Sequence, residues 1–164
     1  MRLQTSAFGL LAIAMLVACD TGTDADLNEQ FSATLTGAAE VPPKTTTASG
    51  GAEFVHDISA AELEFVLTVD DIENVRAAHI HLAQPGANGP VIAFLFSSDN
   101  PVTVSTPTVL STGFIRDADV LTVEGFDGTF ASLMAQIRAG NTYVNVHTTQ
   151  NPGGEVRGQI GAAP

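Results

Sequence analysis

The stretch ELEFVLTV at residues 62–69 decides the fold. Its apolar side chains alternate with residues that are mostly polar, and they stand at Leu63, Phe65, Leu67 and Val69. Successive side chains of a β-strand point to opposite faces of its sheet, so this alternation predicts a strand with one apolar face. The segment before it, residues 52–56, can pair with it as the first arm of a hairpin.

Similar short segments, separated by turn residues, occur on both sides of this hairpin. They cover residues 31–35, 75–82, 91–96, 109–116, 142–148 and 155–160. Between two of them, Asn88-Gly89 is expected to supply the positive φ angles of a tight loop. Short strands at this spacing predict an all-β protein, an immunoglobulin-like or Greek-key β-sandwich or barrel.

One segment has the period of a helix instead. Its apolar residues recur three and four positions apart, at Phe130, Leu133, Met134 and Ile137. Asp127 or Thr129 can cap its start, and Gly140 can close its end. The sequence therefore predicts one short helix near residues 129–139, packed over an end or edge of the strands.

The first 30 residues differ in composition from the rest. An apolar run of eight residues at 10–17 follows Arg2 and is far too short to cross a bilayer as a helix. The sequence Leu16-Val-Ala-Cys19 then matches the lipobox of bacterial lipoproteins. We expect a signal peptide over 1–18, a lipidated Cys19 with a flexible tether over 19–30, and one domain over 31–161. Acyl chains on Cys19 would anchor that domain to a membrane outside the cytoplasm, in the periplasm or at the cell surface.

Composition excludes several classes of function. The chain has 18 acidic and 6 basic side chains, a net charge of −12, and such a surface repels nucleic acid. Cys19 is the single cysteine, so neither an internal disulfide nor a cysteine metal site can form. The chain contains no phosphate-binding glycine loop and no nucleophile elbow. Asp117 and Asp119 stand at an expected strand end, where we interpret them as solvated turn residues.

Three of the four histidines offer a chemical option. His79 and His81 flank Ile80 and share one strand face, and His147 is out of phase with the apolar residues of its own strand. If the two strands are neighbours, three imidazoles converge on one outer patch, a donor set suited to copper or zinc. Exposed or hydrogen-bonded histidines on strands are the alternative, and both interpretations stay open.

The remaining polar residues suggest structural roles. We interpret Glu155 and Arg157, which share a strand face, as a structural pair across neighbouring strands. Asn145 either holds a loop or orients His147. His56 has no partner in the sequence and is treated as incidental.

Five ordered segments resemble the CHRD domain, which is named after chordin. They read FSATLTGAAEVPP (31–43), AHIH (78–81), NGP (88–90), YVNVHT (143–148) and GEVRGQI (154–160). The resemblance implies an immunoglobulin-like β-sandwich or barrel with similarity to copper–zinc superoxide dismutases, and it implies no agreed biochemical activity. We therefore expect a non-catalytic binding or structural module whose ligand, a protein or a glycan, is unidentified.

The dismutase similarity gives the alternative function. In those enzymes a His-x-His on one strand and a later histidine on another bind copper, a pattern matched by His79, His81 and His147. This chain lacks a histidine between His81 and His147 to bridge copper and zinc, and it cannot form the dismutase disulfide. The resemblance implies a protein that binds copper (or zinc), and at most one that also has redox activity like that of superoxide dismutase.

Overall fold

The computed structural model describes residues 28–164, so the predicted signal peptide and Cys19 lie outside the described part. The described strands are β1 (Glu29–Thr36), β2 (Ser49–Asp57), β3 (Glu62–Asp70), β4 (Ile72–Leu82), β5 (Val91–Val104), β6 (Thr108–Ile115), β7 (Thr142–Thr148), β8 (Val156–Gln159) and β9 (Gly161–Ala162). The helical elements are α1 (Phe130–Arg138) and two 3₁₀ turns, η1 (Gly37–Ala39) and η2 (Asp117–Asp119). Within residues 28–164, no helix has the length and apolarity needed to cross a membrane.

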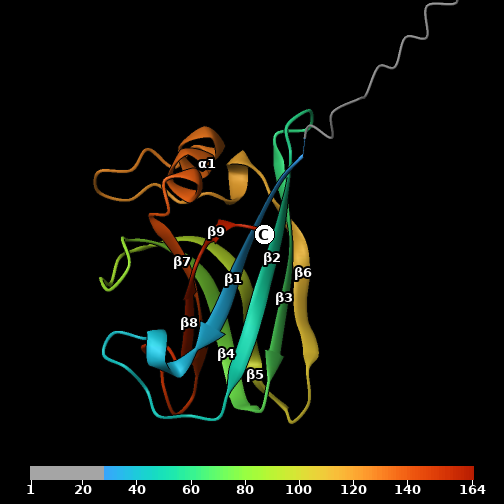
Figure 1. The fold of residues 1–164 in the computed structure, drawn as a ribbon, viewed down its shortest axis with the longest axis vertical. Coiled ribbons are helices and arrows are strands. Elements are labelled where there is room, and N and C mark those ends of the chain that lie inside the picture. Colours follow the sequence, from blue (N-terminus) through green and yellow to red (C-terminus); the bar gives the residue numbers. More distant parts are fainter. Residues whose placement is uncertain (1–27) are drawn as a thin grey trace, which may run out of the picture.

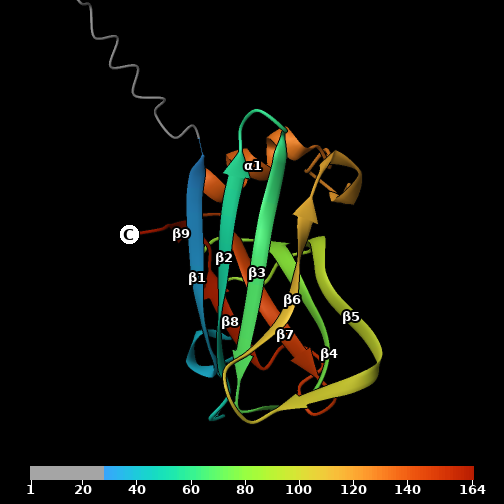
Figure 2. The same ribbon diagram turned by 90° about the vertical axis from the view of Figure 1, so that its right-hand side faces the viewer.

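The strands form one antiparallel sheet that curls into a nearly closed barrel (Figures 1 and 2). Their order is β5-β4-β7-β8-β1-β2-β3-β6, with β9 paired to β1. The two edge strands approach each other, because Ser111 Oγ on β6 donates a hydrogen bond to the Leu95 carbonyl on β5 at 2.7 Å. The predicted all-β sandwich or barrel with one helix is confirmed.

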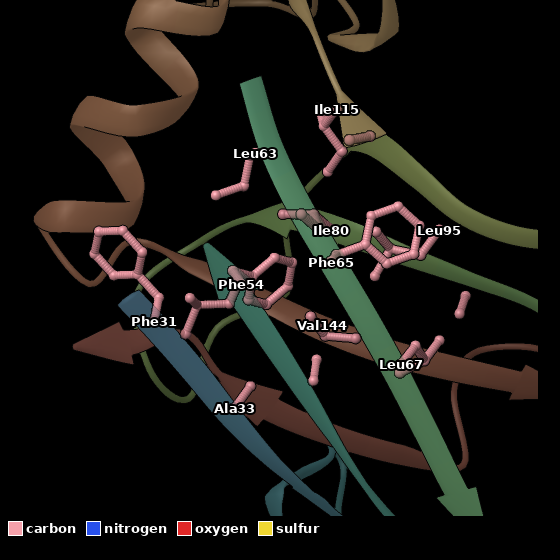
Figure 3. Close-up of a cluster of buried hydrophobic side chains, with 14 of the residues drawn as sticks. Phe31, Ala33, Phe54, Leu63, Phe65, Leu67, Ile80, Leu95, Ile115 and Val144 are labelled. Carbon is pink, nitrogen blue, oxygen red and sulfur yellow. The ribbon is translucent and has the colours of Figure 1, made fainter. Parts of the chain in front are cut away.

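Alternating side chains of these strands fill the barrel. On β3, Leu63 and Leu67 have no exposed surface and Phe65 is 5% exposed. Figure 3 shows these residues of the front strands facing Ile80 of β4 and Val144 of β7, both fully buried, across the interior. The alternation that identified the strand is therefore the alternation between core and outer face.

The helix α1 lies over one end of the barrel (Figure 1). Thr129 is its N-cap, one of the two residues predicted for that role, and its side-chain oxygen accepts a hydrogen bond from the backbone N–H three residues on. Gly140 follows the helix with φ +70°, as a C-terminal glycine should. Asp117 is exposed and lies in the turn η2 after β6, as predicted, and its Oδ1 in addition accepts a hydrogen bond from the backbone N–H of Phe130 at 2.8 Å. The first turn of α1 is thereby tied to η2.

The loop between β4 and β5 uses its glycines differently from the prediction. Asn88 and Gly89 do not take positive φ angles; Gly86 does, at +79°. Gly89 is required by close packing instead, because a Cβ there would lie 1.8 Å from the Leu82 carbonyl oxygen. The glycine was correctly expected in the loop, for the wrong reason.

The first strand begins at Glu29, two residues before the predicted start. Glu29 accepts a hydrogen bond from Arg138 Nε at 2.9 Å and lies 2.7 Å from His56 Nδ1. Hydrogen bonds from Arg138 and His56 lower the pKa of Glu29 to about 2. His56, which had no partner in the sequence, is 6% exposed and joins the strand start to the end of α1.

Candidate metal centre

Two neighbouring strands carry the three histidines. β4 and β7 pair antiparallel, with His79 opposite Asn145 and His81 opposite Tyr143, and His147 lies two residues along β7 from Asn145. All three imidazoles therefore emerge on one face of this strand pair. One ring nitrogen of each histidine can be chosen so that all three lie within 4.8 Å of one another.

Backbone carbonyls determine which ring nitrogens keep a lone pair. His81 Nδ1 lies 2.9 Å from the Gly89 oxygen, and His147 Nδ1 lies 3.0 Å from the Pro152 oxygen. Because a carbonyl only accepts, each Nδ1 carries the proton and each Nε2 of the neutral ring keeps a lone pair. His147 Nε2 uses its lone pair to accept a hydrogen bond from His79 Nδ1 at 3.0 Å, so metal binding at both of these atoms requires the His79 proton to move to its Nε2. His81 Nε2 is buried and has no hydrogen-bond partner.

The cluster is partly enclosed, whereas the sequence predicted an outer patch. His81 is 8% exposed, and the neighbouring Tyr143 and Asn145 are each 2% exposed. The Tyr143 ring stacks on His81 with 4.8 Å between ring centroids. The loop of residues 83–90 contributes to this cover, because the Gly89 oxygen lies 2.9 Å from His81 Nδ1 and the Gly89 N–H donates to the Tyr143 hydroxyl at 3.4 Å.

This enclosure keeps the imidazoles neutral at pH 7. Burial, followed by the proximity of His147 and His81, lowers the pKa of His79 to about 4. Burial also lowers the pKa of His81 and of His147, although the hydrogen bonds to the Gly89 and Pro152 carbonyls raise it. Neutral imidazole is the form that binds a metal ion, so the cluster is ready to bind without first losing protons.

Arg157 braces the loop that covers the histidines. It is 2% exposed, and its Nη1 and Nη2 donate hydrogen bonds to Asn88 Oδ1 at 3.1 Å and to the Ala87 oxygen at 2.8 Å. Its guanidinium carbon lies 3.4 Å from the centroid of the Tyr143 ring, whose other contacts include the stack on His81. One side chain on β8 thus supports both the loop and the wall of the cluster.

Glu40 and Asn145 form a buried polar pair beside the cluster. Burial raises the pKa of Glu40, which is 3% exposed, although the Arg157 charge opposes the change. The Asn145 amide lies next to both the Glu40 carboxyl group and the His81 ring. These contacts are not well-formed hydrogen bonds, because Glu40 Oε1, Asn145 Oδ1 and His81 Nε2 all lack a partner. Asn145 therefore borders the His81 ring; the sequence left open whether it holds a loop or orients His147.

Glu155 and Arg157 do not pair with each other as predicted. Glu155 instead accepts hydrogen bonds from Thr46 Oγ1 at 2.8 Å and from Thr148 Oγ1 at 2.6 Å. Burial raises the pKa of Glu155, but the hydrogen bonds from Thr148 and Thr46 outweigh it and leave that pKa below its ordinary value. Its role is to join the end of β7 to the loop before β2.

A family model for the CHRD domain matches residues 31–160. The chain belongs to the CHRD family. No curated protein and no solved structure matches it. The matched residues run from β1 to the residue after β8, so the CHRD domain comprises nearly the whole barrel, its helix and all three clustered histidines. Membership is consistent with the binding or structural module that the sequence predicted.

The histidine cluster of this CHRD domain opens to the surface on one side. A pocket of about 620 Å³ is lined by His79 and His147, among other residues, and not by His81. Two of the candidate ligands can therefore be reached by a small molecule, and the third lies behind them.

Sequence reasoning missed the groups that orient the rings. The carbonyls of Gly89 and Pro152 have no side-chain signal, so only the loop conformation reveals them. Glu40 had one signal, its place inside the first segment that resembles the CHRD domain.

Proposed function

We propose that this CHRD-domain protein is a lipid-anchored, extracytoplasmic metal-binding module that holds one transition-metal ion, copper or zinc, through His79, His81 and His147. The observation that carries the proposal is the cluster itself: one ring nitrogen of each histidine lies within 4.8 Å of the other two, and the buried Nε2 of His81 has no hydrogen-bond partner. A buried polar atom without a partner costs free energy, and a bound ion would remove that cost.

The donor set fits such an ion. Nitrogens bound to one tetrahedral ion at about 2.0–2.1 Å lie about 3.3 Å from one another. His79 Nδ1 and His147 Nε2 are 3.0 Å apart, and all three candidate donors lie within 4.8 Å. A small rotation of the rings would bring the set to the required spacing. Imidazoles held by backbone carbonyls through the opposite nitrogen are the usual arrangement around protein-bound metals.

Among divalent ions, nitrogen ligands bind copper most tightly, which favours copper over zinc. With three protein ligands, the ion would keep an open position, where it would act as a Lewis acid or, for copper, exchange one electron. Other residues would form the surroundings of the ion: the carbonyls of Gly89 and Pro152 orient the rings of His81 and His147, and Tyr143 shields His81. Binding of the ion is therefore the function that we propose for this set.

The lipid anchor rests on the sequence. Leu16-Val-Ala-Cys19 has the lipobox pattern, and nine residues lie between Cys19 and Glu29, the first residue of β1. That interval is polar and acidic, which suits a tether between a membrane and the barrel.

Metal titration of the full chain tests the binding function. Cys19→Ser protein, which lacks the lipidation site, would be titrated with Cu²⁺ and Zn²⁺ by calorimetry, beside His81→Ala and His147→Ala variants. We expect one ion per chain and a loss of affinity of about 100-fold or more in each variant. His56→Gln, which changes the one histidine outside the cluster, is the matched control and should bind normally. Equal binding by His81→Ala and the parent protein would overturn the proposal and direct the search to protein or glycan ligands.

A further inference from the structure

The pocket beside His79 and His147 has a composition that the metal site alone does not explain. Its volume is about 620 Å³, and apolar side chains form much of its wall, including Ala77, Val91 and Pro101. Pockets of this size bind small organic molecules, with apolar walls holding the body and a few polar groups fixing the orientation. A site for a metal ion and water alone would need no such cavity.

Arg76 supplies a positive charge at this pocket. It lines the cavity, it is exposed, and its Nη1 donates to the Asp99 carbonyl at 2.8 Å. Arg116 and Arg138 form ion pairs with glutamates, whereas Arg76 has no carboxylate partner among residues 28–164. In a chain with 18 acidic and 6 basic side chains, an unpaired guanidinium at a pocket is well placed to attract an anion.

We propose that the pocket binds a small organic carboxylate with an apolar or aromatic body. The carboxylate would lie between Arg76 and the ion held by His79 and His147, and the body would pack against Ala77 and Val91. A planar guanidinium matches a carboxylate in shape and charge, and a carboxylate oxygen is an ordinary ligand for the open position of a three-histidine site. This inference rests on the proposed metal-binding function and names the ligand class of the same site.

Benzoate and benzamide provide a matched pair of probes, because they share a ring and differ in charge. Copper-loaded full chain with Cys19→Ser would be titrated with each by calorimetry, and the copper EPR spectrum would be recorded with and without the probe. We expect benzoate to bind at least about tenfold more tightly than benzamide and to change the copper EPR spectrum.

Two variants separate the pocket from general charge effects. Arg76→Gln should weaken benzoate binding about tenfold and leave copper binding unchanged, whereas Arg116→Gln, which removes an exposed arginine elsewhere on the barrel, should change neither. Pro101→Trp places a bulky side chain in the pocket wall from an exposed position and should weaken both probes.

The results of these titrations distinguish failure of the carboxylate site from failure of the metal site. If copper binds and benzoate shows no advantage over benzamide, or if Arg76→Gln and Arg116→Gln bind benzoate equally, the carboxylate site is refuted and the metal site stands. If neither copper nor zinc binds to the parent chain, the proposed function fails and the carboxylate site fails with it.

Discussion

Gly89 shows how one residue determines the orientation of a candidate ligand. Its carbonyl oxygen accepts the Nδ1 proton of His81, which leaves the opposite nitrogen free. Its Cα packs so closely on the preceding strand that a Cβ would lie 1.8 Å from the Leu82 oxygen. A side chain at this position must therefore move the carbonyl on which the His81 ring depends.

Gly89→Ala should lower copper affinity about tenfold and reduce stability by about 1–3 kcal/mol, because the loop must shift away from His81. Copper affinity would be measured by competition with a chelator, and stability by urea unfolding. Gly161→Ala is the control, since a Cβ there meets nothing within 4 Å. Gly89→Ala protein with the copper affinity of the control would show that the carbonyl does not position the ring.

Glu29 gives the protein a pH-dependent contribution to stability. Its pKa is lowered from 4.5 to about 2 by hydrogen bonds from Arg138 and His56. A carboxylate whose pKa is lowered by folding stabilises the folded state above its unfolded pKa, and that contribution is lost as the pH falls through the folded pKa. The window therefore runs from about pH 4.5 down to about pH 2.

At pH 7, Glu29→Gln should lower the melting temperature by a few degrees, about 1 kcal/mol after allowance for the partial exposure of the carboxylate. The difference from the parent protein should shrink steadily below pH 4.5 and vanish near pH 2. Thermal unfolding followed by circular dichroism would measure it, with Glu64→Gln, an exposed glutamate of β3, as the control. A difference that stays constant down to pH 2 would contradict the assignment.

At the scale of the elements, β4 and β7 bring the site together. The alternation in each strand predicted which side chains share a face, because that property depends only on neighbours in the sequence. Alternation does not state which strands pair, and β4 pairs with β7, a strand that follows it in the chain only after β5, β6 and α1. The predicted convergence of His79, His81 and His147 therefore depended on the pairing of β4 with β7, which no local sequence pattern predicts.

Loops limited the prediction further. The face of β4 and β7 away from the core was expected to be exposed, but Gly89 of the loop 83–90 contacts His81 and Tyr143, and Asn145 lies beside the buried Glu40. The path of a loop is determined by contacts with distant residues, here with Arg157 on β8. The fold class and the strand positions followed from the sequence, and the enclosure of the site did not.

The strand that identified the fold should also carry a large share of its stability. Leu67→Ala removes a fully buried side chain from β3 and should destabilise the protein by about 2–5 kcal/mol, measured by urea unfolding. Val66→Ala, at the neighbouring partly exposed position on the opposite face, should cost less than about 1 kcal/mol. Equal losses in the two variants would mean that the alternation of β3 does not separate core from surface.

At the scale of the whole molecule, the barrel and the N-terminal segment have separate tasks. We propose that the described part of the chain holds an ion and a ligand, and the predicted lipid on Cys19 would determine where it does so. Because Cys19 is the single cysteine of the chain, its substitution would remove the predicted lipid without breaking a disulfide.

Cys19→Ser should lose lipid labelling and move from the membrane fraction to the soluble fraction of the cell, while the folded barrel melts at an unchanged temperature. Fractionation after labelling with a radioactive fatty acid would measure both properties. Thr21→Ala, in the predicted tether, should keep label and location. Retention of the Cys19→Ser protein in the membrane fraction would refute the lipid anchor.

The position of Arg157 near the end of the chain has a consequence for the order of assembly. Its partners Asn88 and Ala87 precede it by 69 and 70 residues, so the hydrogen bonds from Arg157 to the loop that orients His81 form only when β8 docks. During synthesis, His79 and His81 emerge well before Arg157 does. A growing chain would therefore expose two histidines without a formed site, and tight metal capture would begin only once the protein is complete.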